Sequence, residues 1–145
     1  MRQKNRFFAV VCGIALVGIG AVMLCAWAAG MGRTYTLHLP AADTLEKAVC
    51  TQGEERVEIT DNGAVETLLA LLEEGRQTQE ESIQDFPVGA NRVVTFTFFF
   101  SEGGASTLFA YEKRGRYYIE QPYNGIYPLA KEEWGQLLAC AGWEA

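Results

Sequence analysis

Histidine is almost missing from this sequence, which holds a single one, His38, in 145 residues. A zinc site needs several clustered Cys and His ligands, and no such spacing occurs. A Gly-x-Ser-x-Gly nucleophile motif is missing as well. We therefore expect no metal, no cofactor and no catalytic residue. A dyad of His38 with a cysteine is the remaining catalytic alternative.

Positive charge is scarce beyond the first few residues. Arg2, Lys4 and Arg6 stand near the N-terminus, whereas all 18 acidic residues and the other nine basic residues follow residue 32. The part of the chain after residue 32 therefore has a formal charge of −9. Nucleic-acid binding needs a cationic face, and anionic lipid attracts basic segments. This charge balance argues against both as partners.

Charge of either sign is lacking over the 23 residues from Phe7 to Ala29. A helix of that length spans roughly 34 Å, and a bilayer core is about 30 Å thick. Because the basic residues that precede this segment should stay in the cytoplasm, we predict a single-pass anchor in the cell membrane with the C-terminal domain outside. Two alternatives remain. Cleavage at the small-x-small sequence 26–28 would secrete the domain, and Cys25 could carry a lipid, although Leu24 is larger than a lipid-attachment motif prefers.

The chain is accordingly divided into an anchor or signal segment (1–30), a linker (31–34) and an extracytoplasmic domain (35–145). Alternating apolar residues predict strands in the domain, at 35–39, 45–51, 56–60, 91–101, 106–112 and 116–121. Tight turns join the last three of these strands, which predicts an antiparallel three-strand meander. The polar segment 76–90 contains Pro87 and Gly89 and is predicted to be a long loop.

Two helices are predicted from apolar stripes. The first follows the N-cap residue Asp61 and should end by Gly75, with a stripe of Val65, Leu68, Leu69 and Leu72. The second covers 131–141, with a stripe of Trp134, Leu137, Leu138 and Ala141. The expected fold class is α+β, an antiparallel sheet covered by two helices behind one N-terminal transmembrane helix.

Cysteine leaves two interpretations open. Cys50 and Cys140 are the two thiols beyond the predicted anchor. An oxidising compartment would permit a disulfide between them, closing a loop of about 90 residues and stabilising the fold by roughly 4 kcal/mol. Two buried free thiols are the other interpretation.

Aromatic residues are concentrated in one segment. Residues 117–128 hold four tyrosines, two prolines and an Asn-Gly pair. Tyrosine combines a flat apolar ring with a polar tip, which suits a recognition surface. The alternative is that these tyrosines close the core while Pro122 and Gly125 shape a connector to the last helix.

Two motifs resemble those of a known family. They are the loop residues Thr78, Ser82, Asp85 and Pro87, and the later run Tyr117–Tyr127, which reads YYIEQPYNGIY. In combination and spacing they resemble the bacterial domain-of-unknown-function family numbered 5301, over about residues 35–141. The resemblance implies an exported or lipid-anchored domain with no assigned activity, so it carries no function over.

Both motifs lie in loops, where sites usually form, and we expect them to meet at one edge of the sheet. The candidate binding residues are Ser82, Asp85, Tyr118, Glu120, Tyr123, Asn124 and Tyr127. The favoured function is a membrane-tethered binding or sensing module whose partner is a protein or an envelope glycan, not nucleic acid. An inhibitor or accessory subunit of an exported or membrane enzyme is the alternative, followed by an enzyme with an unfamiliar site.

Overall fold

The computed structural model describes residues 32–144 of the chain. The predicted membrane segment 7–29, with Cys25, lies outside the described residues. Within residues 32–144, no helix is both long enough and apolar enough to cross a membrane. Residues Thr34–Ala145 belong to one compact unit.

A six-stranded sheet forms the centre of the domain, in the order β3-β2-β5-β6-β7-β8 with every neighbouring pair antiparallel. Its strands are β2 (Leu45–Gln52), β3 (Glu55–Ile59), β5 (Arg92–Phe100), β6 (Ala105–Lys113), β7 (Arg116–Glu120) and β8 (Ile126–Leu129). Strands β5 to β8 follow one another in the sheet as well as in the sequence. The meander therefore has four strands rather than three, because β8 is a strand that the sequence pattern did not predict.

The segment predicted as a first strand, residues 35–39, is not part of the large sheet. Only β1 (Tyr35–Thr36) is a strand, and it pairs with β4 (Gln77–Thr78) inside the predicted loop 76–90. The chain then continues through a short 3-10 turn, η1 (Ala42–Thr44), into β2. Leu37 is nevertheless fully buried, and its N–H donates to the carbonyl oxygen of Arg76 at 2.8 Å.

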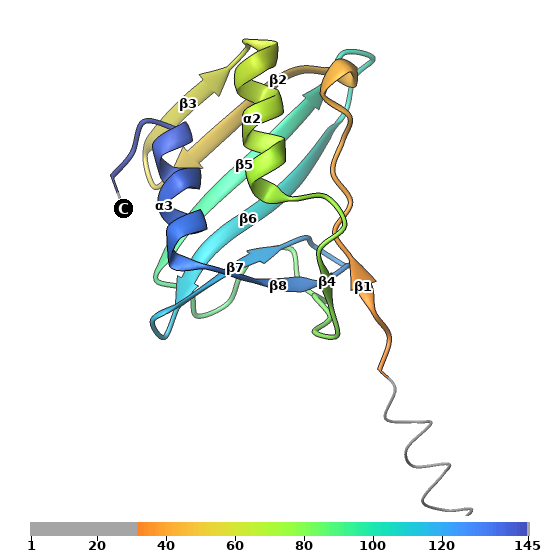
Figure 1. The fold of residues 1–145 in the computed structure, drawn as a ribbon, viewed down its shortest axis with the longest axis vertical. Coiled ribbons are helices and arrows are strands. Elements are labelled where there is room, and N and C mark those ends of the chain that lie inside the picture. Colours follow the sequence, from red (N-terminus) through yellow and green to blue (C-terminus); the bar gives the residue numbers. More distant parts are fainter. Residues whose placement is uncertain (1–31, 145) are drawn as a thin grey trace, which may run out of the picture. The chain divides into compact units, whose positions relative to one another are not determined.

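Two helices lie over the same face of the large sheet, α2 (Asn62–Leu72) and α3 (Lys131–Cys140) (Figure 1). Asp61 caps α2 by accepting the Ala64 N–H at 2.9 Å, which is the N-cap contact expected from the sequence. The helix ends at Leu72, before Gly75, and Glu73 closes it with a φ of 59°. Gly75 instead donates its N–H to the carbonyl oxygen of Leu37.

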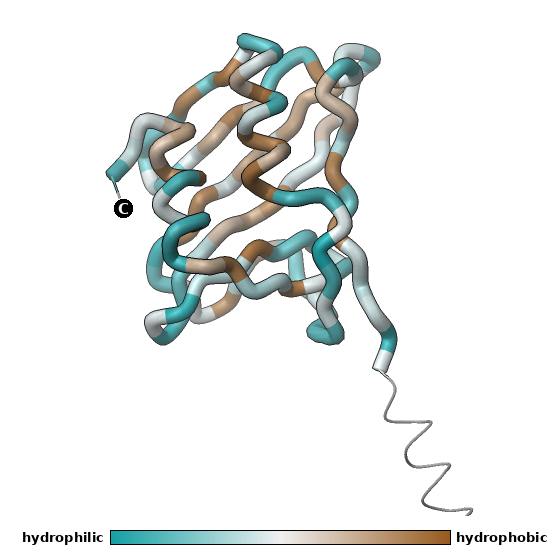
Figure 2. Tube along the Cα trace, in the orientation of Figure 1, coloured by the Kyte–Doolittle hydropathy of each residue, from teal (hydrophilic) through white to brown (hydrophobic). Residues whose placement is uncertain are grey.

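The hydrophobic core fills the space between the helices and this sheet face. It includes the inward residues of both helices and of alternate strand positions, such as Val65, Leu68, Leu72, Trp134, Leu137, Leu138, Phe96, Phe98, Leu108 and Ile119. Figure 2 shows apolar residues along the strands and helices and hydrophilic residues at many of the turns. The predicted stripes of both helices are buried, except that Leu69 is only partly so.

The opposite face of the sheet is covered differently. Strand alternation places Phe109, Tyr111 and Glu120 on this face, and all three are buried. The long loop (residues 79–91) reaches them, since the ring of Phe86 meets the ring of Phe109 edge-on at 5.2 Å. A loop rather than a helix therefore closes this part of the sheet.

Both cysteines of the domain are free thiols in the structure. Cys50 is buried in β2 and Cys140 is half-buried at the end of α3. Burial, and to a lesser extent Cys140, raise the pKa of Cys50 to about 12. Burial also raises the pKa of Cys140. Neither thiol is thereby activated as a nucleophile at neutral pH.

Candidate functional site

The two motif-bearing loops lie side by side at the β8 edge of the sheet. The Ser82 N–H donates to the carbonyl oxygen of Asn124 at 3.1 Å, and the Ile126 N–H donates to that of Glu80 at 2.9 Å. Glu81 and Gly125 form an isolated antiparallel bridge between these two contacts. The structure therefore brings the Thr78–Pro87 motif and the Tyr117–Tyr127 motif together, although 38 residues separate Ser82 from Glu120.

A buried polar pair joins the loop to the sheet. Ser82 and Glu120 are only 2% and 3% exposed, and the Ser82 hydroxyl donates to Glu120 Oε1 at 2.7 Å. Tyr111 lies beside them. Burial, and to a lesser extent the Glu120 carboxylate, raise the pKa of this tyrosine. The ring of Tyr118 stacks on that of Tyr111 with 5.6 Å between centroids. A buried carboxylate is costly unless it is hydrogen-bonded, so this pair fixes the path of the loop.

A second pair, Asp85 and Tyr123, is exposed. The Tyr123 hydroxyl donates to Asp85 Oδ1 at 2.5 Å, and this hydrogen bond raises the pKa of Tyr123. Pro122 and Tyr123 are the central residues of a turn closed by the Asn124 N–H and the Gln121 carbonyl oxygen. Tyr123 has a φ of 57°, a conformation in which glycine is usual at this turn position. The chain thus keeps an exposed tyrosine where the backbone favours glycine, which points to a use for the side chain.

Asn124 and Tyr127 have structural contacts instead. Asn124 Nδ2 lies within hydrogen-bond distance of Thr36 O (2.7 Å), Gln121 Oε1 (2.6 Å) and Tyr127 Oη (3.0 Å). Tyr127 is fully buried, and burial raises its pKa to about 12. These two residues anchor the first strand to the turn.

Gln121 completes the same connection and was missed from the sequence. Its side-chain amide accepts from the His38 N–H at 3.2 Å and donates to the His38 carbonyl oxygen at 2.8 Å. His38 itself is exposed, and its ring makes no hydrogen bond or ion pair with any described residue. No pattern in a single sequence connects two positions 83 residues apart.

Exposed large apolar side chains gather on the same two loops. Within residues 32–144 there are four, each between 54% and 71% exposed, and we call them the loop patch: Ile83, Phe86, Val88 and Tyr123. Only Tyr123 was among the residues singled out from the sequence. The sequence does carry a signal for the other three, because apolar residues in an otherwise polar loop are not explained by a helix or strand period.

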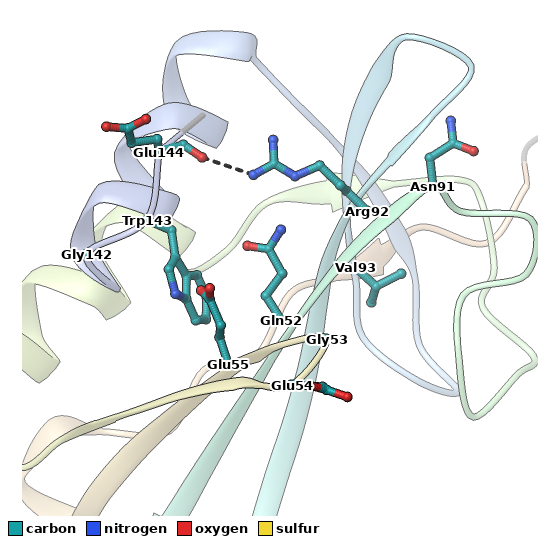
Figure 3. A pocket seen from close by; sticks show the side chains of 10 residues that line it. All are labelled: Gln52, Gly53, Glu54, Glu55, Asn91, Arg92, Val93, Gly142, Trp143 and Glu144. Atoms are coloured by element: carbon teal, nitrogen blue, oxygen red, sulfur yellow. Dashed lines mark hydrogen bonds between the residues drawn. The ribbon is translucent and has the colours of Figure 1, made fainter.

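A wide hollow lies elsewhere, between the β2–β3 turn, the start of β5 and the residues after α3 (Figure 3). It encloses about 830 Å³. The basic residue that lines this hollow is Arg92. Its guanidinium donates to the carbonyl oxygen of Glu144 at 3.0 Å, and its Cζ atom lies 5.6 Å from the centroid of the Trp134 ring. The group best suited to hold a ligand is thus already engaged within the fold.

These features define an α+β domain with two helices on one sheet face and two loops joined at the β8 edge, the longer of which reaches the other face. The family model DUF5301, described as a domain of unknown function (DUF5300), matches residues 33–128. The chain therefore belongs to this family, as its two motifs suggested.

A solved relative supports the same fold. An NMR structure of a protein from Ruminococcus gnavus is 29% identical to this chain, with a TM-score of 0.57. The match covers 68% of this chain and 98% of that protein. No curated protein matches the chain.

Proposed function

We propose that this protein is a membrane-tethered extracytoplasmic binding module whose loop patch contacts a protein partner. The proposed tether is the uncharged segment 7–29, with the three basic residues before it on the cytoplasmic side. The acidic domain would then stand outside the membrane. The partner would be read by a surface made of Ile83, Phe86, Val88 and Tyr123.

The observation that carries this proposal is the concentration of exposed apolar side chains on two loops. A folded domain gains nothing in stability from leaving large apolar groups in water, and exposed apolar groups concentrated in one part of a surface are typical of interaction sites. Aromatic side chains such as Phe86 and Tyr123 are enriched at protein interfaces because they bury a large area with few rotatable bonds. The hydrogen bond from Tyr123 to Asp85 holds the two loops in one arrangement, which lowers the entropy cost of binding.

Binding is favoured over catalysis because the polar groups of these loops are already paired with one another. The Ser82 hydroxyl is directed to Glu120, and Asp85 accepts from Tyr123. A nucleophile would instead need a nearby base such as an imidazole. We accordingly propose no catalytic residue and no cofactor for this site.

In-cell photo-cross-linking of the full-length chain tests the proposal. A photoreactive phenylalanine replaces Phe86 in the loop patch or, as the matched control, Glu66, which is exposed on α2. Position 86 should give a discrete cross-linked product that position 66 does not give. Adding Tyr123→Gly should remove the product without unfolding the domain, because glycine tolerates the φ of this position.

The outcomes separate the alternatives. Equal cross-linking at positions 86 and 66, or none at 86, would contradict a docking role for the loop patch. If the captured protein is an exported hydrolase that the domain silences, the function is that of an inhibitor or accessory subunit. The tether is tested separately by high-pH extraction of membranes, and recovery of a soluble form that starts near Ala29 would exclude a retained anchor.

A further inference from the structure

Unpaired positive charge is concentrated at one place on this acidic domain. Lys47, Arg56 and Arg76 form ion pairs with glutamates, and Arg92 is engaged as described above. The side chains of the remaining basic residues of the domain make no hydrogen bond or ion pair with any described residue. Four of these residues lie in or near the β6–β7 hairpin: Lys113, Arg114, Arg116 and Lys131. The fold itself therefore does not use these four charges.

Three of these cations line a hollow of about 420 Å³ on the sheet face opposite the helices. The stacked rings of Tyr111 and Tyr118 line it as well, and Glu80 stands at its wall. A neighbouring hollow of about 690 Å³ shares Glu80, Arg116 and Tyr118 and continues to Lys131. We call the two together the hairpin groove.

The turn of the hairpin holds one of these cations, Arg114, in a conformation that arginine disfavours. Arg114 has a φ of 54° and Gly115 a φ of 73°, so both turn residues are left-handed. Asn-Gly is the usual pair for such a turn, because asparagine tolerates this conformation better than arginine. A cation thus occupies the position where the backbone disfavours it, at the rim of the groove.

We propose that the hairpin groove binds an anionic carbohydrate, a sugar chain whose units carry carboxylate or phosphate groups. The guanidinium of Arg116, with Lys113 and Arg114, provides charged donors for such a group. The half-buried ring of Tyr118 provides a flat surface for the C–H face of a sugar ring.

Glu80 favours a sugar over a simple anion. A carboxylate repels a bare phosphate, whereas it accepts hydrogen bonds from sugar hydroxyls. The second carboxylate nearby, Glu120, is buried behind Tyr111 and bonded to Ser82, so the groove keeps an excess of positive charge. The extension to Lys131 fits a chain of sugars rather than a single unit. This inference depends on the residues of the hairpin groove and not on the loop patch.

Amide NMR of the full-length chain in non-ionic detergent micelles tests it with five probes: galacturonate, tetragalacturonate, galactose 6-phosphate, galactose and inorganic phosphate. We expect saturable shifts at residues 111–118 and 126–131 with an anionic sugar, and at least about tenfold weaker binding of galactose and of inorganic phosphate. Tetragalacturonate should bind more tightly than galacturonate, because only the chain reaches Lys131. A response to galacturonate alone or to galactose 6-phosphate alone identifies the anionic group.

Variants locate the site. Arg116→Gln should weaken binding of both galacturonates at least about tenfold, and Lys131→Gln should weaken only the tetramer. Arg56→Gln removes the same charge from β3 and should leave binding unchanged, with the amide spectrum reporting that each variant is folded. The inference is overturned if neither anionic sugar gives saturable shifts, if galactose or inorganic phosphate binds as tightly, or if Arg56→Gln and Arg116→Gln have equal effects.

Discussion

The sheet face under the helices is closed by apolar side chains, whereas the opposite face carries a buried carboxylate, exposed apolar loops and unpaired cations. Helices α2 and α3 each provide a continuous stripe that matches the inward residues of the strands. The long loop that lies on the other face leaves Ile83, Phe86 and Val88 in solvent. Stability is therefore supplied mainly on one side of the sheet, and the features that stability does not explain are on the other side or at its edge.

Neighbouring phenylalanines on β5 test this comparison most strongly. Phe98 is fully buried under the helices, and Phe99 is half-buried on the opposite face, where Lys47 lies 5.6 Å from its ring centroid. Phe98→Ala should lower the free energy of unfolding by about 3–5 kcal/mol, because it leaves a cavity in the core. Phe99→Ala should cost about 1–2 kcal/mol, in proportion to the smaller area that it buries. Denaturant unfolding measures both, and equal losses would show that something covers the second face as fully as the helices cover the first.

The packing between the two motif loops comes next in size. A Cβ atom on Gly125 would lie 2.7 Å from Thr78 Cγ2 and 2.9 Å from Tyr127 Oη. Gly125→Ala should therefore lower the free energy of unfolding by about 1–3 kcal/mol through overpacking. Gly53→Ala is a useful contrast, because a Cβ atom added there would have no neighbour within 4 Å. Any loss of stability in that variant reports only the φ of 59° at this position. A Gly125→Ala variant as stable as the parent would mean that the loops are not packed as described.

The helix-covered side could be predicted from the sequence because its periodicities are local. The alternation of Phe96 and Phe98 and the stripe of α2 each identify a buried face within one element. Strand β8 was missed because it has only four residues and includes Pro128, which cannot donate to a sheet. Its place at the edge of the sheet explains why proline is accepted there.

The candidate site could be predicted only in part. The motif residues Ser82 and Glu120 were singled out, but their mutual hydrogen bond joins positions 38 residues apart and depends on the whole fold. Left-handed conformations at Tyr123 and Arg114 have no sequence signal, since both residue types disfavour them. The roles of Asn124 and Tyr127 in holding β1 were likewise invisible until the strand pairing was known.

A polar contact on the helix-covered side gives a smaller, pH-dependent effect. Arg76 Nη2 donates to Glu133 Oε1 at 2.6 Å, and this bond lowers the pKa of Glu133 below its ordinary value of 4.5. The contact therefore stabilises the fold above pH 4.5, and its contribution is lost as the pH falls through the lowered pKa. Glu133→Gln should cost about 1 kcal/mol or less near pH 7. Thermal unfolding of both proteins across the pH range checks this, and a difference that persists in acid would contradict the ionic origin.

The smallest effect separates stability from binding on the open face. The Arg114 side chain makes no hydrogen bond or ion pair with any described residue, and its left-handed conformation costs about 1–2 kcal/mol relative to an unstrained residue. Glycine removes this cost but loses more conformational freedom on folding, so Arg114→Gly should raise the free energy of unfolding by about 0.5 kcal/mol. The same variant should bind tetragalacturonate more weakly, because one charge at the rim of the hairpin groove is gone. Lys113→Gly is the matched control, since it lacks the left-handed backbone and should lose stability. Two results would contradict a binding role for Arg114 in the hairpin groove. One is a loss of stability in Arg114→Gly equal to that in Lys113→Gly, and the other is a gain of stability with unchanged binding of tetragalacturonate.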